Sequence, residues 1–112
     1  MGDSESQIGQ KVAQLEVNFR PLALDDIAEV AAFYARQDDD RLVRRFLSAI
    51  DQATERISAF PLSCPKYHRN SRRLMLRAFP FCVCYRVVDD TVQVLAVLHA
   101  KRDLGILRRR VE

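Results

Sequence analysis

The chain is short of the residue types that build the commonest sites for phosphates and metals. Its 112 residues include only three glycines, too few for a Gly-rich phosphate-binding loop, and no serine-nucleophile or paired-carboxylate motif occurs. The three cysteines, Cys64, Cys82 and Cys84, form no CxxC pair and have no second cluster to complete a zinc site. We therefore expect neither a metal nor a cofactor.

Long apolar segments are absent as well. No apolar run approaches the roughly 18 residues that a membrane span needs, and the N-terminus lacks the basic and apolar regions of a signal peptide. We expect no membrane contact and a location in the reducing cytoplasm. There the thiols would stay unpaired and act as small buried hydrophobic side chains.

Charge is distributed unevenly along the chain. Residues 1–65 carry 7 Lys or Arg against 11 Asp or Glu, a balance of −4, whereas residues 66–112 carry 11 against 4, a balance of +7. A local excess of positive charge concentrates polyanions nearby and speeds their capture. The C-terminal half is therefore predicted to meet nucleic acid or an acidic protein segment, unless it is simply a basic soluble surface.

The N-terminal half begins with a predicted strand and helix. Residues 1–14 are polar and are expected to form a flexible or short helical leader, and we place a single domain over residues 15–112. Alternating apolar and polar side chains predict a strand over Leu15–Arg20, which Pro21 stops. Apolar residues at helical spacing predict a first helix over Leu24–Ala35.

A second helix is predicted after a short connection. The acidic run Asp38–Asp40 offers a cap and favourable partners for the helix dipole. Pro61 ends the helix, because the residue before a proline is pushed out of helical geometry. The short connection between the two patterns predicts an antiparallel helical hairpin.

Three strands are predicted after an irregular loop, residues 61–71. The runs Arg72–Phe79, Phe81–Val88 and Thr91–His99 have the length and residue types of strands, and their tight spacing favours an antiparallel meander. The element order predicts an α+β fold with both helices on one side of a twisted antiparallel sheet, which leaves the other side for function. The tail, Lys101–Glu112, is either a frayed basic helix or a phosphate-contacting arm.

Basic and aromatic side chains are left to carry the function. Cleavage of RNA without a metal needs a base, an acid and cations that stabilise the phosphorane. Histidine is the natural acid or base near neutral pH, and His99, at a strand end, is the candidate catalytic residue. The same set of residues equally suits a non-catalytic surface for an acidic partner. The candidates for binding a target or nucleic acid are Lys66, Arg69, Arg73, Arg77, Arg86, Lys101 and Arg102.

Three side chains of this half have structural interpretations that compete with a functional one. Tyr85 lies on the apolar face of its strand, which favours a core aromatic over a platform for base stacking. Arg86 either contacts a ligand on the sheet face or forms a salt bridge with a helix carboxylate. His68, in the loop, is expected to be solvated rather than catalytic.

Short motifs along the chain occur in a combination that is typical of a known family. The C-terminal motifs are Arg73-Leu74, Phe79-Pro80-Phe81, Tyr85-Arg86-Val87, Asp89-Asp90, Val94-Leu95-Ala96-Val97-Leu98-His99 and Arg102-Asp103. The upstream residues are Pro21, Ala23, Asp25-Asp26-Ile27, Tyr34 and Phe60-Pro61. In this combination residues 17–103 resemble the RelE/ParE superfamily of bacterial toxins, which includes plasmid stabilisation proteins.

The resemblance implies the toxin of a type II toxin–antitoxin pair. Such a toxin is held inactive in a heterocomplex by a cognate antitoxin, whose C-terminal segment wraps the toxin and covers its basic sheet. ParE-like members poison DNA gyrase, whereas RelE-like members cut mRNA on the ribosome; either activity arrests growth.

The ending Val-Leu-His-x-x-Arg-Asp resembles the ParE-like members more closely. RelE-like enzymes have lysines around the second helix and a C-terminal tyrosine, whereas here that helix has no lysine and no tyrosine follows Tyr85. The resemblance therefore favours a gyrase inhibitor with Arg73, Arg86, His99 and Arg102 as contacts. A ribosome-dependent mRNA endonuclease, in which His99 assists proton transfer, and an inactive domain that binds an acidic partner are the alternatives.

Overall fold

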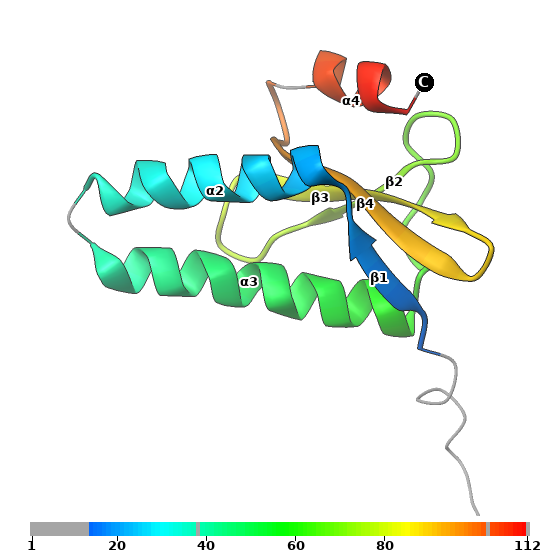
Figure 1. Ribbon diagram of the computed structural model, residues 1–112, viewed down its shortest axis with the longest axis horizontal. Helices are drawn as coiled ribbons and strands as arrows, with labels where there is room; N and C mark the ends of the chain where they lie inside the picture. The colour runs from blue at the N-terminus through cyan, green and yellow to red at the C-terminus, as the bar shows by residue number, and fades with distance from the viewer. Residues whose placement is uncertain (1–13, 38, 103, 112) are drawn as a thin grey trace, which may run out of the picture.

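A helical hairpin packs on one side of a four-stranded sheet, and a short C-terminal helix packs on the other (Figure 1). The structure is a computed structural model that describes residues 14–37, 39–102 and 104–111. The predicted leader, residues 1–14, lies outside these residues except for Gln14. Within the described ranges, no helix is long and apolar enough to cross a membrane.

Helices α2 and α3 form the predicted antiparallel hairpin. Helix α2, Pro21–Ala35, starts earlier than the predicted Leu24, because proline fits the first helical position, where its missing N–H costs nothing. Helix α3 spans Asp40–Ala59, and Asp39 caps it by accepting the Leu42 N–H on its Oδ1 at 3.1 Å. The predicted acidic cap is confirmed.

The sheet has the order β1-β4-β3-β2. Strands β3 (Phe81–Val88) and β4 (Thr91–His99) have the predicted bounds, whereas β2 (Arg72–Met75) is shorter than predicted. Strand β1 (Glu16–Phe19) pairs in parallel with β4, so the prediction of a wholly antiparallel sheet is wrong in this detail. The helical hairpin separates β1 from the meander along the chain, and in the sheet the first strand lies beside the last. The α+β class with both helices on one face is confirmed.

The first core lies between the sheet and the helical hairpin. Phe46 and Ile57 of α3 and Val83 and Tyr85 of β3 are buried there. Phe46 makes edge contacts with Tyr34 and two further aromatic rings, at centroid distances of 5.5 to 6.0 Å. These contacts fix the helices on the sheet and leave the opposite sheet face to the C-terminal segment.

Helix α4, Leu104–Arg110, covers that opposite face. Leu107 is fully buried against Cys82, Cys84 and Leu98 of the sheet. The expectation that this sheet face is left open for function is therefore wrong: its centre is a second small core, and basic residues lie around its rim. The interpretation of the tail as a helix is confirmed.

A β-bulge builds this second core. Cys84 pairs with Ala96 and Tyr85 with Val94, so Leu95 is an extra residue on β4. Leu95 and Ala96 consequently both contribute to the second core. In a regular strand, neighbouring side chains point to opposite faces, so one of the two would lie in the first core.

Candidate functional site

Basic side chains predicted to bind or act on a target lie together where β4 ends. Arg73 comes from β2, His99 is the last residue of β4, and Lys101 and Arg102 lie in the turn that follows. Lys101 and Arg102 are exposed, whereas Arg73 and His99 are half-buried. We call these four residues the basic corner.

Arg73 connects β2 to the end of β4. Its Nη1 donates a 3.3 Å hydrogen bond to the carbonyl of Ala100. Its guanidinium carbon lies 4.0 Å from the centre of the Tyr67 ring, which is a cation–π contact. A guanidinium carries five N–H donors, so these contacts leave Arg73 with donors for a phosphate or carboxylate.

His99 contacts Phe81 and the backbone of Lys101. Its ring meets the ring of Phe81 edge to face, with centroids 5.7 Å apart. Its Nδ1 accepts the backbone N–H of Lys101 at 3.2 Å. Because Nδ1 is the acceptor in this contact, the proton of the neutral ring lies on Nε2. The two contacts hold the imidazole ring at the end of β4.

Arg69 and Arg86 meet in a separate hollow on the α4 side of the sheet. The hollow has a volume of about 200 Å³, and its remaining lining residues are Asn70, Ser71 and Val111. Arg86 Nε donates to Oε1 of its cross-strand neighbour Gln93 at 2.9 Å. Within the described residues Arg86 forms no salt bridge with a helix carboxylate, so that predicted alternative is wrong.

Two further candidates lie elsewhere. Arg77 follows β2 and lines a groove along α3, and Lys66 is exposed in the loop, where it forms an isolated bridge with Arg72. The candidate residues are thus divided among the basic corner, the hollow, the groove and the loop.

An ion pair that the sequence analysis did not single out holds α4 in place. Arg110 Nη1 lies 2.6 Å from Asp26 Oδ2, and Nη2 lies 3.1 Å from Oδ1. Asp26 Oδ2 also accepts the Val97 N–H at 2.9 Å, and Arg110 Nη1 donates to the Leu95 carbonyl at 3.1 Å. Strand β1 pairs with β4 only as far as Val94. Beyond that residue, the Asp26 and Arg110 side chains bond to the backbone of β4 where a neighbouring strand would otherwise do so. The partners lie 84 positions apart, and no local pattern signals the pair.

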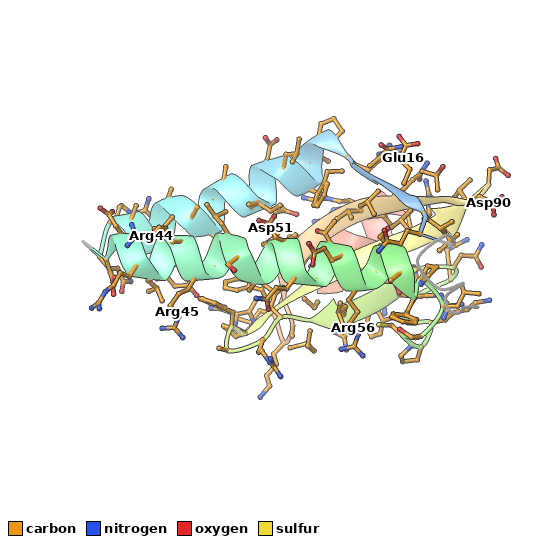
Figure 2. The ribbon with its side chains drawn as sticks, turned by 90° about the horizontal axis from the view of Figure 1, so that it is seen from below. Glu16, Arg44, Arg45, Asp51, Arg56 and Asp90 are labelled. Carbon is orange, nitrogen blue, oxygen red and sulfur yellow. The ribbon has the colours of Figure 1, made fainter. Side chains whose placement is uncertain are left out.

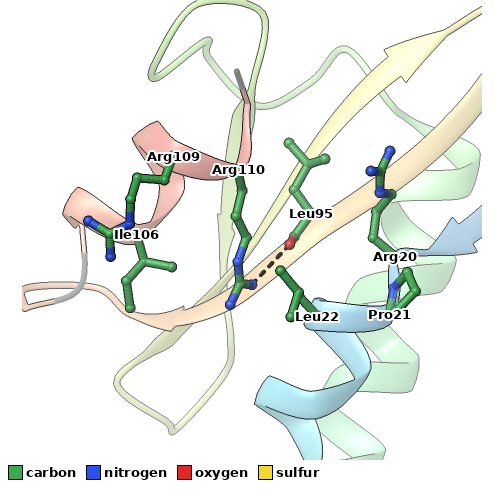
Figure 3. Close-up of a pocket in the computed structure, with 7 residues that line it drawn as sticks. All are labelled: Arg20, Pro21, Leu22, Leu95, Ile106, Arg109 and Arg110. Carbon is green, nitrogen blue, oxygen red and sulfur yellow. Dashed lines mark hydrogen bonds between the residues drawn. The ribbon is translucent and has the colours of Figure 1, made fainter.

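A pocket of about 670 Å³ opens beside this ion pair, between the start of α2 and α4 (Figure 3). Leu22, Leu95 and Ile106 give it apolar walls, and Arg20 and Arg109 lie at its margin. Both of these arginines are exposed, so they extend the positive surface on the α4 side of the molecule.

Tyr85 lies in the core, whereas His68 is half-buried in the loop before β2. Tyr85 is fully buried and its hydroxyl donates to the Pro61 carbonyl at 2.7 Å, which confirms the core interpretation. Burial, reinforced by the Cys64 thiol, raises the pKa of Tyr85. The expectation that His68 is solvated is wrong: it is half-buried, and within the described part of the chain its buried Nε2 has no hydrogen-bond partner.

All three thiols are buried, as predicted. Cys82 and Cys84 lie beneath α4 with their sulfur atoms 3.8 Å apart, and this hydrogen bond together with burial raises the pKa of Cys84. Among residues 14–37, 39–102 and 104–111, no three His, Cys, Asp or Glu side chains form a group that would hold a metal ion.

A helical hairpin on one face of a small sheet, a covering C-terminal helix and a basic corner define a toxin domain of the RelE/ParE superfamily. The family model described as "ParE toxin of type II toxin-antitoxin system, parDE" matches residues 17–104. Toxin ParE2 of Mycobacterium tuberculosis is 32% identical over 75 residues, which cover 67% of this chain and 71% of that toxin. The chain therefore belongs to the ParE toxin family of type II toxin–antitoxin systems.

Solved structures share the fold. A chain of the chromosomal ParDE toxin–antitoxin system from P. aeruginosa superposes with a TM-score of 0.69 at 14% identity, over 80% of this chain and 99% of that one. A chain of the RelBE2 toxin–antitoxin complex from M. tuberculosis superposes with a TM-score of 0.54 at 21% identity, over 77% and 98%. At these identities the comparison concerns the fold alone, and it agrees with the sequence match.

Proposed function

We propose that this toxin inhibits DNA gyrase through its basic corner and is neutralised by a cognate antitoxin in a heterocomplex. The match to the ParE family over residues 17–104 carries the proposal, because that segment runs from Val17 in β1 through the helical hairpin and the other three strands to the basic corner. The proposal treats residues 15–112 as one toxin domain acting in the cytoplasm, where gyrase is found. The superposed structures come from systems named for a toxin and its antitoxin, which supports the partner.

The chemistry of the corner suits a binding role. Arg73, Lys101 and Arg102 supply positive charge for an acidic protein surface or for gyrase-bound DNA. The match to the ParE family is what favours gyrase binding over RNA cleavage.

A supercoiling assay with purified gyrase and relaxed plasmid tests the proposal. We expect the free toxin to reduce supercoiling and the antitoxin to restore it. The double variant Arg73→Gln and Arg102→Gln should inhibit at least about tenfold less, whereas Arg44→Gln on the solvent face of α3 should inhibit like the wild type. Unchanged supercoiling in the presence of the free toxin would contradict the proposal. Cleavage of a reporter mRNA on translating ribosomes would point instead to a RelE-like endonuclease, and failure in both assays to an inactive binding domain.

A further inference from the structure

The pocket between the start of α2 and α4 has the size and the walls of a small-molecule site. Its volume of about 670 Å³ lies within the roughly 300–1,000 Å³ that is typical of ligand pockets. Leu95 lines it from β4 and is 2% exposed, whereas Leu22 lines it from α2 and is 53% exposed. The half-buried Ile106 of α4 completes the apolar lining (Figure 3). A ligand with an apolar body would remove this leucine surface from water, which favours binding.

The charge around the pocket is positive and partly uncompensated. Arg110 is paired with Asp26 beside the pocket, so the charges of these two side chains cancel. Arg20 and Arg109, at the margin, are exposed and form no salt bridge within the described residues. In the described part of the chain, no acidic residue lines the pocket. An anionic group at the margin is therefore attracted by two guanidinium groups.

Positive charge on α3 is arranged differently. Exposed Asp51 lies between exposed Arg45 and Arg56 along this helix (Figure 2), so its surface carries both signs. A mixed surface of this kind is typical of a solvated helix face. The pocket beside α4 instead combines apolar walls with charge of one sign, which distinguishes it as a ligand site.

We propose that this pocket binds a small amphipathic anion, in which an aliphatic or aromatic body carries one acidic group. The apolar body lies against Leu22, Leu95 and Ile106, and the acidic group lies at the margin beside Arg20 and Arg109. Inorganic phosphate has no apolar body to bury, and a neutral apolar molecule gains nothing from the arginines. The pocket consequently selects molecules that have both parts, and the inference does not depend on the target of the toxin.

A bound anion also stabilises α4 on the sheet. Ile106 and Arg109 belong to α4, whereas Leu22 belongs to α2, so the ligand contacts both helices. Since the complete pocket exists only while α4 is docked, the ligand reduces release of α4 by a factor of one plus the ratio of its concentration to its Kd. Cys82 and Cys84 lie beneath α4, so the rate at which these thiols react reports the release.

Binding of the fluorescent anion anilinonaphthalene sulfonate to the full chain tests the pocket. Leu22→Glu removes an apolar wall and adds negative charge, so its affinity for this probe should fall at least about tenfold. Leu24→Glu is the matched control, because Leu24 lies on the same helix, is also 53% exposed and is not among the residues that line the pocket. Its affinity should stay within about twofold of the wild type. Both variants should fold, since the helix dipole favours an acid near the start of α2.

A second set of variants tests the charge. Arg20→Gln combined with Arg109→Gln should weaken binding of anilinonaphthalene sulfonate about fivefold. Arg108→Gln, at an exposed neighbour outside the pocket, should leave the affinity within about twofold. Phenylnaphthylamine has the same rings without the sulfonate, so it should bind the wild type and the double variant equally. A double variant that binds the sulfonate as tightly as the wild type would overturn the preference for an anion.

Decanoate is the probe for the stabilisation of α4. It should displace the fluorescent anion, and at about ten times its Kd it should slow the reaction of Cys82 and Cys84 with a thiol reagent about tenfold. In Leu22→Glu the same concentration should slow this reaction by no more than about twofold. Thiols that react at one rate with and without decanoate would overturn the stabilisation of α4. Equal binding of the sulfonate to Leu22→Glu and Leu24→Glu, or no binding to the wild type, would overturn the site itself.

Discussion

Loss of the Asp26–Arg110 pair should release α4 from the sheet. The Arg110 and Asp26 side chains are only 15% and 13% exposed, so Arg110→Met leaves a largely buried carboxylate with the Val97 N–H as its remaining partner. Breaking a fully buried pair costs roughly 3–5 kcal/mol, and residual exposure here reduces the expected loss to about 2–3 kcal/mol. That is a large part of the roughly 5–15 kcal/mol by which a domain is stable.

The released helix has little stability of its own. Helix α4 has 7 residues, fewer than the roughly 12–15 that an isolated helix needs. Its release would expose Cys82 and Cys84, which are 1% and 0% exposed beneath it. We expect Arg110→Met to lower the free energy of unfolding in urea by that amount and to speed the reaction of these two thiols with a thiol reagent. Cys64, which lies in the other core, should react as before.

Arg109→Met is the matched control, since Arg109 is the exposed neighbour of Arg110 and has no ion pair within the described residues. It should change the free energy of unfolding by less than about 0.5 kcal/mol. If Arg110→Met is as stable as this control and leaves both thiols protected, then the pair does not hold α4 and the reasoning fails.

Two further predictions concern buried and strained residues of the sheet. Tyr85→Phe leaves the Pro61 carbonyl without its donor and should cost about 1–2 kcal/mol at pH 7. Burial raises the pKa of Tyr85, so its hydroxyl stabilises the fold fully below pH 10, the ordinary tyrosine value, and progressively less above it; urea unfolding at pH 7 and pH 11 should show the gap narrowing, and a constant gap would contradict this. Asp89 and Asp90 both have positive φ, 52° and 63°, as a type I′ turn requires, so Asp90→Gly should raise the free energy of unfolding by about 0.5–1 kcal/mol; a lower melting temperature would show that the Asp90 side chain stabilises the turn.

Local patterns predicted the elements well because their causes are local. The bounds of β3 and β4 follow from runs of strand-forming residues between turns, and the cap at Asp39 follows from the chemistry of an aspartate before a helix. The predicted start of α2 is late because the alternating pattern before Pro21 indicates the end of a strand there, although proline also favours the first helical position.

The missed features depend on long-range contacts. The parallel pairing of β1 with β4 joins segments separated by the helical hairpin, and Asp26 gains its role only because Arg110 returns to it across the sheet. The apolar residues of the basic tail, Leu104, Ile106, Leu107 and Val111, form too short a pattern to predict that α4 covers the sheet face. The candidate site residues could be named from the sequence by their residue types. Their division between the basic corner and other surfaces could not be predicted, because it depends on how distant segments pack together.

The amount of covalent gyrase–DNA cleavage complex that accumulates with the purified toxin tests the central claim most directly. We predict that the wild type traps this complex and that Arg73→Gln combined with Arg102→Gln traps at least about tenfold less while unfolding at the same urea concentration as the wild type. No trapped complex with the wild type, or equal amounts with both proteins, would contradict the account of a gyrase-directed toxin acting through its basic corner.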